Sequence, residues 1–191
     1  HLGLLKRRYT PEGVDLEAFR EIQDQLAQLK TLTDRFLNYS REVKPVYEPM
    51  KPANLIRDAV AARATAGRET GITVSVPPDL EMSGDVLMWR QIIDNLIDNA
   101  VAACRPHDVK LNIDVYTKAG SIVFRFADGG AGVAADLIPR LFTPFATGRP
   151  DGHGIGLALV RKCVEAHNGC IRHETPPSGG AAFIIEVPGE Q

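Results

Sequence analysis

The sequence reads Asn95-Leu96-Ile97-Asp98-Asn99-Ala100, then Asp128-Gly129-Gly130-Ala131-Gly132, and then Gly152-His153-Gly154-Ile155-Gly156-Leu157. One glycine-rich hexapeptide alone is a weak signal, because such runs often occur by chance. The three segments together describe a nucleotide pocket. The first offers two amides on a helix, the second offers a carboxylate at a strand end beside a glycine turn, and the third is a glycine loop that opens another helix.

Asn95 and Asn99 are four residues apart, so they lie on one face of the helix expected at 85–104. Mg²⁺ prefers hard oxygen ligands and keeps several waters, so amide oxygens and phosphates form a sensible coordination set. The spacing therefore predicts that Asn95 and Asn99 bind a metal ion or a phosphate group. The alternative is that both are solvated surface residues, but their helix otherwise carries core-forming side chains.

The glycine loop precedes a helix expected from about residue 154 to residue 167. Backbone amides at the start of a helix, together with the helix dipole, favour negative charge, so we predict that this loop contacts phosphates. Six predicted nucleotide-binding residues belong to it: Gly152, His153, Gly154, Ile155, Gly156 and Leu157.

On these residues the chain resembles the ATP-binding domain of sensor histidine kinases, which belong to the GHKL ATPase and kinase superfamily. The resemblance extends from about Asp15 to the C-terminus and implies ATP and Mg²⁺ as ligands. It implies that Asn99 corresponds to the magnesium-binding asparagine of the family's N-box. It also implies that Asp128 corresponds to the aspartate that accepts a hydrogen bond from the adenine amino group, while Gly130 and Gly132 let the backbone turn beneath the base.

Residue 95 bears on the type of reaction. Hydrolytic branches of the superfamily, such as gyrase and the mismatch-repair ATPases, place a water-activating glutamate there, whereas Asn95 is a poor general base. A γ-phosphoryl group is then preserved until a better nucleophile arrives. This residue therefore favours a kinase over a water-activating ATPase clamp.

Residues 141–151 resemble the family's F-box followed by a short ATP lid. The resemblance makes Phe145 a hinge residue that packs the lid on the domain. Arg149 is the one cation in this segment and is therefore the candidate for a phosphate contact, with a solvated arginine as the alternative. His153 stands where family members often carry threonine, which leaves a pH-sensitive nucleotide contact or a plain packing role open.

The spacing of apolar residues over 15–41 predicts one long helix with a heptad seam of apolar and small side chains. The seam consists of Phe19, Ile22, Leu26, Leu29, Thr33, Phe36 and Ser40. Such a seam needs a partner, and residues 2–9 look like the end of a partner helix. We therefore expect a partial dimerisation and phosphotransfer hairpin at 1–44 that forms a homodimeric four-helix bundle, with a linker at about 42–52. The alternative is an amphipathic helix that packs on its own domain.

After this linker, helices and strands alternate, and we predict that residues 45–191 form the catalytic ATP-binding domain. The expected helices are 52–68, 85–104 and 154–167, and the expected strands are 72–76, 109–117, 121–127, 170–174 and 181–187. Helices on one face of a mixed sheet give an α+β fold, here a two-layer α/β sandwich. The resemblance identifies this sandwich with the Bergerat ATP-binding fold.

The resemblance also implies a reaction, in which the γ-phosphoryl group of ATP passes to a histidine and then to a response-regulator aspartate. The family's acceptor lies in a His-Glu/Asp-x-x-Asn/Thr-Pro-like segment, and the residues after His1 lack both the acidic neighbour and the proline. The helix expected at 15–41 spans about 40 Å, whereas residues 1–9 span only about 14 Å. We therefore expect an acceptor histidine outside this chain and a response-regulator receiver domain as a partner. The alternative function is a nucleotide-binding regulatory module of the same fold that acts by docking a partner.

The chain has 191 residues, a net charge of −2 and 44% hydrophobic residues. This charge gives no electrostatic reason to bind nucleic acid or an anionic membrane, so we expect neither contact. No apolar run approaches the roughly 18 residues of a membrane span, and the N-terminus has no signal-peptide pattern. The three cysteines form no metal-type pair and are predicted to be reduced, with a catalytic cysteine as the alternative. We therefore expect a cytoplasmic fragment, whether or not a longer parent protein is anchored upstream in a membrane.

Overall fold

The computed structural model describes residues 16–40, 44–63, 71–104, 109–149 and 152–189. By its internal contacts the chain divides into two compact units, residues 1–41 and residues 42–191. The first unit contributes one long helix, and the second contains all of the described strands. Among the described helices, none is both long enough and apolar enough to cross a lipid bilayer.

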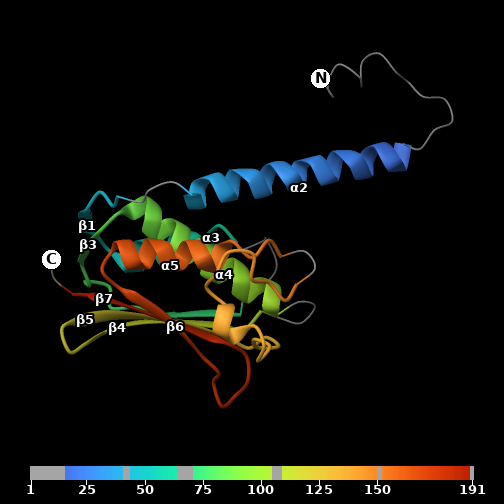
Figure 1. Cartoon of the computed structure of the whole chain (residues 1–191). Helices are drawn as coiled ribbons and strands as arrows, with labels where there is room; N and C mark the ends of the chain where they lie inside the picture. The colour runs from blue at the N-terminus through green and yellow to red at the C-terminus, as the bar shows by residue number, and fades with distance from the viewer. Residues whose placement is uncertain (1–15, 41–43, 64–70, 105–108, 150–151, 190–191) are drawn as a thin grey trace. The chain divides into compact units, whose positions relative to one another are not determined.

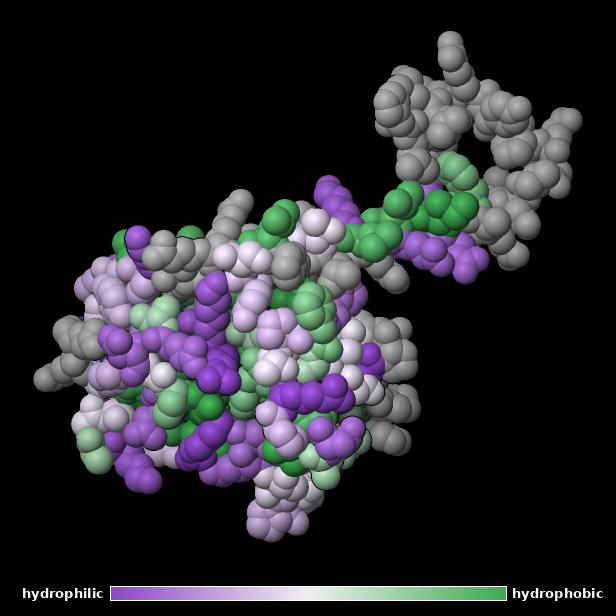
Figure 2. Space-filling model, viewed as in Figure 1, coloured by the Kyte–Doolittle hydropathy of each residue, from purple (hydrophilic) through white to green (hydrophobic). Residues whose placement is uncertain are grey.

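Helix α2 (Leu16–Ser40) is the described part of the first unit. At 1.5 Å per residue its 25 residues extend about 38 Å. Exposed apolar side chains lie along this helix (green in Figure 2), and the largest of them are Ile22, Leu26, Leu29 and Leu37. A row of exposed apolar side chains at helical spacing favours a partner helix. The partner helix predicted at residues 2–9 lies outside the described residues.

The second unit is a sheet with helices on one of its faces (Figure 1). The strands are β2 (Ile72–Ser75), β4 (Leu111–Lys118), β5 (Ser121–Asp128), β6 (Cys170–Glu174) and β7 (Ala182–Pro188). They lie in the order β2-β4-β5-β7-β6, in which β2 pairs with β4 in parallel and the other neighbours are antiparallel. The covering helices are α3 (Pro52–Ala61), α4 (Val86–Ala103) and α5 (Gly156–Ala166). A single-turn helix, η1 (Ile138–Arg140), lies in the loop after β5. These two layers confirm the predicted α+β sandwich.

Helix α4 packs on the sheet through one apolar face. The Trp89 ring lies 4.5 Å from the Phe124 ring of β5, measured between centroids. The face continues along the helix through four side chains that are at most 1% exposed: Ile92, Ile93, Leu96 and Ile97. Burial of each such side chain contributes about 1.5–3 kcal/mol, so the position of α4 over the sheet is strongly fixed.

The helix expected at 52–68 is shorter in the structure, because α3 ends at Ala61. Arg63 closes that end by donating its backbone N–H to the Val60 carbonyl over 3.0 Å. The Arg63 guanidinium donates to the Asp94 carboxylate of α4 over 2.8 Å, so the same turn also fixes α3 against α4. The remainder of the expected range falls largely outside the described residues.

The sequence does not predict a second, two-stranded sheet that the structure contains. Strand β1 (Glu48–Met50) lies in the segment expected to be a linker and pairs antiparallel with β3 (Met82–Gly84). Pro49 has no N–H to donate, and it is accommodated because each of these strands has one neighbour. Strands of three residues leave no detectable period in a sequence, which is why the motif was not predicted.

Asp85 caps the start of α4 and binds the linker at the same time. Its Oδ1 accepts the Met88 N–H over 3.0 Å, and its Oδ2 accepts the Val46 N–H over 2.9 Å. Burial tends to raise the pKa of Asp85, but the backbone hydrogen bonds from Val46, Met88 and Leu87 outweigh it and hold the pKa below its usual value. The folded state therefore favours the carboxylate form.

We expect Asp85→Ala to lower the free energy of unfolding by about 1 kcal/mol or more, because an N-cap aspartate contributes about that much. Thermal unfolding of the full chain measures the loss, with Asp79→Ala at an exposed turn residue as the control. Since the folded-state pKa is lowered, the stabilisation is fully present above about pH 4 and is lost as the pH falls through the folded-state pKa. A stability difference between parent and variant that stays constant below pH 4 would contradict this assignment.

Candidate functional site

One pocket lies between the C-terminal half of α4, the end of β5, the loop that follows β5, and the start of α5. Its volume of about 420 Å³ falls in the range of small-molecule sites. Seven of the predicted site residues line it: Asn99, Asp128, Gly132, Arg149, Gly154, Gly156 and Leu157. The structure therefore brings parts of all three sequence segments to one cavity.

Asp128 ends β5 and is 7% exposed. Its Oδ1 accepts the backbone N–H of Gly130 over 2.9 Å and that of Ala181 over 3.3 Å. Burial raises the pKa of Asp128, while these two hydrogen bonds and the nearby His173 act in the opposite direction. Both hydrogen bonds end on Oδ1, so Oδ2 is available to a donor in the pocket.

The turn after Asp128 packs closely against α4. A Cβ at Gly130 would lie 2.8 Å from the Ala103 Cβ, so only a glycine lets the turn approach that far. Gly132 has a φ of 78°, in the left-handed region that favours glycine. Gly132 lines the pocket, whereas Gly130 does not and packs against Ala103.

Asn99 and Arg149 come from different elements and meet at the pocket. Arg149 Nη2 donates to Asn99 Oδ1 over 3.3 Å. Thr147 Oγ1 shapes the loop by accepting the Arg149 N–H over 3.1 Å. The Asn99 Nδ2 is buried and has no hydrogen-bond partner among the described residues. The amide that was predicted to bind a metal ion is thus paired with the residue that was predicted to contact phosphate.

Asn95, the other predicted metal ligand, does not line the pocket. Its Nδ2 donates to the Gln91 carbonyl one turn earlier in α4, over 2.7 Å. Its Oδ1 lies 2.8 Å from the point that a Cβ on Gly156 would occupy. A glycine at 156 therefore lets the start of α5 approach α4, and Asn95 lies at that contact.

Gly154 and Phe145 bring the glycine loop against the lid segment. Both have left-handed backbones, with φ values of 66° and 65°, and a Cβ at Gly154 would lie 2.5 Å from the Phe145 carbonyl carbon. The Phe145 side chain is itself exposed. Of the remaining loop residues, Gly152 and His153 are half-buried and Ile155 is fully buried, and none of the three lines the cavity.

The start of α5 is open toward the pocket. No described side chain caps this end of the helix. The first N–H groups of an α-helix have no partner within the helix, and they favour an anion together with the helix dipole. Because Gly154, Gly156 and Leu157 line the pocket, these groups are accessible to a ligand there.

The rest of the pocket lining is mostly apolar and was not among the predicted site residues. It consists of Ala102, Ala103, Ala131, Val133, Ala134, Leu137, Leu141, Ala146, Ala181 and Phe183, together with Thr147 and Gly148. Phe183 pairs in register with Phe126 of β5 on one side and with His173 of β6 on the other. Pairing between distant strands places Phe183 at the pocket, and no local pattern in the sequence encodes that register.

Comparison with known proteins defines the class of this chain. Residues 84–191 match the family of histidine kinase-, DNA gyrase B- and HSP90-like ATPases, and the chain belongs to that family. Similar proteins include sensor proteins and sensor histidine kinases. The chain is 31% identical over 177 residues to the C4-dicarboxylate transport sensor protein DctB of Rhizobium meliloti, covering 91% of this chain and 28% of DctB. It is 30% identical over 193 residues to the sensory histidine kinase/phosphatase NtrB of Rhodobacter capsulatus, covering 92% of this chain and 53% of NtrB.

Solved structures agree with this placement. The catalytic domain of the histidine kinase ThkA matches with a TM-score of 0.67 at 25% identity, covering 76% of this chain and 97% of that domain. ThkA in complex with the response regulator protein TrrA matches with a TM-score of 0.75 over 98% of this chain and 56% of that one, and at 24% identity this likeness concerns the fold alone. The resemblance to GHKL-type sensor histidine kinases is thereby confirmed. The chain spans about a quarter of DctB and about half of NtrB.

Proposed function

We propose that this chain binds Mg²⁺-ATP in the 420 Å³ pocket and is the catalytic part of a sensor histidine kinase. The observation that carries the proposal is the convergence of Asn99, Asp128 and the open start of α5 on one cavity. They supply an amide oxygen, a carboxylate and unpaired N–H groups. A metal-bound nucleoside triphosphate uses all three.

Asp128 binds the base in this proposal. Its Oδ1 is engaged by two backbone N–H groups, which orient the carboxylate and leave Oδ2 to accept from the adenine amino group. Guanine presents a carbonyl oxygen at the corresponding position, which two carboxylate oxygens repel. The apolar wall, Phe183 included, suits a flat ring.

Asn99, Arg149 and the first amides of α5 bind the phosphates and the metal ion. The Asn99 amide fits Mg²⁺ because its oxygen is a hard ligand whose present partner is one exposed arginine, and its Nδ2 is under-bonded. When bound, Mg²⁺ neutralises phosphate charge. Arg149, once released from Asn99, is free to donate to phosphate oxygens. Asn95 does not line the pocket, its Nδ2 donates to Gln91 and its Oδ1 lies at the Gly156 contact, so we assign it mainly to the alignment of α5.

The residues of the site position the nucleotide and do not themselves react. Asn95 provides no general base for water, so the γ-phosphoryl group is kept for a histidine that lies outside this chain. A response-regulator aspartate takes the group from that histidine. The exposed seam of α2, which includes Leu26 and Leu29, pairs with a second copy of the chain to form the homodimer.

Nucleotide choice tests the base site. We expect the parent chain to bind Mg²⁺-ATP and Mg²⁺-ADP well and Mg²⁺-GTP poorly, and Asp128→Ala to weaken ATP binding at least about tenfold, because a buried charged hydrogen bond is lost. Isothermal titration calorimetry measures both, with Asp136→Ala on the exposed loop as the charge-matched control. Equal affinity of the parent for ATP and GTP would remove the adenine assignment.

Phosphoryl transfer is tested by supplying ATP and the acceptor histidine separately, with the histidine on a second protein. With radiolabelled ATP, this chain alone is expected to show no acid-labile, base-stable label on itself. A second protein that carries a complete first hairpin helix with its acceptor histidine is expected to become labelled when the chain is added. Strong labelling of His1 would overturn the external acceptor. Tight ATP binding without any transfer would favour a regulatory nucleotide-binding module.

A further inference from the structure

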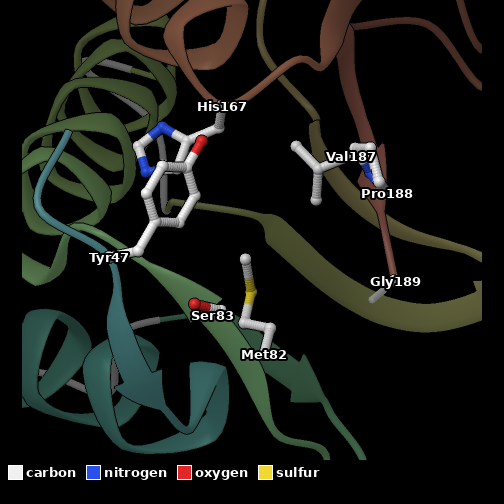
Figure 3. A pocket seen from close by; sticks show the side chains of 7 residues that line it. All are labelled: Tyr47, Met82, Ser83, His167, Val187, Pro188 and Gly189. Carbon is white, nitrogen blue, oxygen red and sulfur yellow. The ribbon is translucent and has the colours of Figure 1, made fainter. Parts of the chain in front are cut away.

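A second polar cluster lies at the opposite end of α4 from the pocket. It consists of Tyr47 from the linker, Asp85 at the start of α4 and His167 at the end of α5, and we call these three residues the linker lock. Figure 3 shows the Tyr47 ring beside the His167 imidazole, with the Met82 and Val187 side chains directed into the space next to them. None of the three lock residues lines the 420 Å³ pocket.

Hydrogen bonds in the linker lock join three segments. The linker donates to Asp85 through the Val46 N–H over 2.9 Å, and the Tyr47 hydroxyl donates to the Ala166 carbonyl of α5 over 3.3 Å. The Asp85 N–H donates to His167 Nε2 over 3.0 Å, which connects the start of α4 to the end of α5. The linker is thus bound to both helices that form the pocket.

His167 is the centre of this arrangement. Its imidazole is 4% exposed and lies between the rings of Tyr47, at 5.5 Å, and Trp89, at 5.6 Å. Because Nε2 accepts a hydrogen bond, Nδ1 carries the hydrogen and donates to the Cys163 carbonyl over 2.7 Å. Both ring nitrogens are therefore committed to holding segments together.

Strand pairing of the linker is less extensive than pairing within the main sheet. Strand β1 pairs with β3 over three residue pairs, whereas β5 pairs with β7 over seven. Val46 is 73% exposed, and the cavity that adjoins Tyr47 has a volume of only about 10 Å³. A strand held by three residue pairs opens at lower cost than the main sheet, and the bonds of the linker lock add to the buried Met50 side chain and the Lys51–Glu81 ion pair in retaining it.

Release of the linker changes the length of chain between the two units. With the lock formed, Val46 is fixed, and the chain from Ser40 at the end of α2 to Val46 spans at most about 22 Å. With the lock open and β1 unpaired, the free chain extends from Ser40 to Lys51 and spans at most about 40 Å. The lock therefore sets how far the nucleotide-binding unit can move from α2.

We propose that Tyr47, Asp85 and His167 are positioning residues for phosphoryl transfer, which hold the linker on the nucleotide-binding unit and limit its reach from α2. This inference rests on the proposed function, because transfer requires bound ATP to meet a histidine on the α2 side of the linker. The lock acts by limiting the length of free chain between α2 and the nucleotide-binding unit, and it leaves the pocket unchanged. The lock residue Asp85 lies about 20 Å along α4 from Asn99, which agrees with a role in the linker and not in nucleotide binding.

Hydrogen exchange of the full chain tests the lock directly. We expect Tyr47→Ala and His167→Leu to raise the exchange of the 46–50 amides at least about fivefold, while β4 and β5 exchange as in the parent. His167→Gln restores an acceptor for the Asp85 N–H and is expected to recover most of the protection. Tyr116→Ala is the matched control, because Tyr116 and Tyr47 are 42% and 41% exposed.

Two spin labels measure the distance between α2 and the nucleotide-binding unit. With labels at Lys30→Cys and Lys118→Cys in a Cys170→Ser chain, the distance distribution is expected to broaden in Tyr47→Ala and His167→Leu and not in Tyr116→Ala. Affinity for Mg²⁺-ATP should stay within twofold of the parent in every variant. Unchanged linker exchange, or a rise spread evenly over all strands, would overturn the lock. Failure of the parent to bind Mg²⁺-ATP would instead overturn the proposed function, and the exchange and distance data would still decide whether the lock exists.

Discussion

The burial of one face of α4 against the sheet is the constraint on which the rest of this structure depends. Trp89 packs on Phe124 near the start of that face, and the buried aliphatic side chains of the face continue from Ile92 to Ala100. The same helix carries the cap of Asp85 at its beginning and Asn99 in its last turns. A helix fixed in this way gives Asn99 one position before any ligand arrives, which lowers the entropic cost of binding.

Some hydrogen bonds around the pocket are fixed by the fold, whereas others can be exchanged for bonds to a ligand. Asp128 Oδ1 is bound by backbone N–H groups of its own turn and of the segment before β7, so the carboxylate is oriented by the fold. The Arg149–Asn99 hydrogen bond, in contrast, joins an exposed loop residue to the helix over 3.3 Å. Such a bond contributes about 1 kcal/mol or less, so a phosphate-bearing ligand that offers Arg149 a charged acceptor replaces it readily.

The order of the helices and strands could be predicted from periodicity and turn residues, and so could Asn99, Asp128 and the glycine loop as candidates. What the sequence could not supply depends on contacts between distant segments. The side chain of Asn95 does not line the pocket and lies instead at the contact between α4 and Gly156 of α5. Phe183 reaches the pocket through strand register, and β1 is too short to leave a period. The lock residue His167 likewise has no local signature, since its role follows from the meeting of the linker with the ends of two helices.

We propose that Asn99 binds the metal ion of a bound nucleotide, and the dependence of ATP affinity on Mg²⁺ decides whether it does. Calorimetric titrations with ATP in excess Mg²⁺ and in EDTA give this dependence for the parent, for Asn99→Ala and for the exposed control Asn112→Ala. We expect Mg²⁺ to strengthen ATP binding in the parent and the control, and most of this gain to disappear in Asn99→Ala while its thermal stability is retained. An equal gain from Mg²⁺ in a stably folded Asn99→Ala would contradict it.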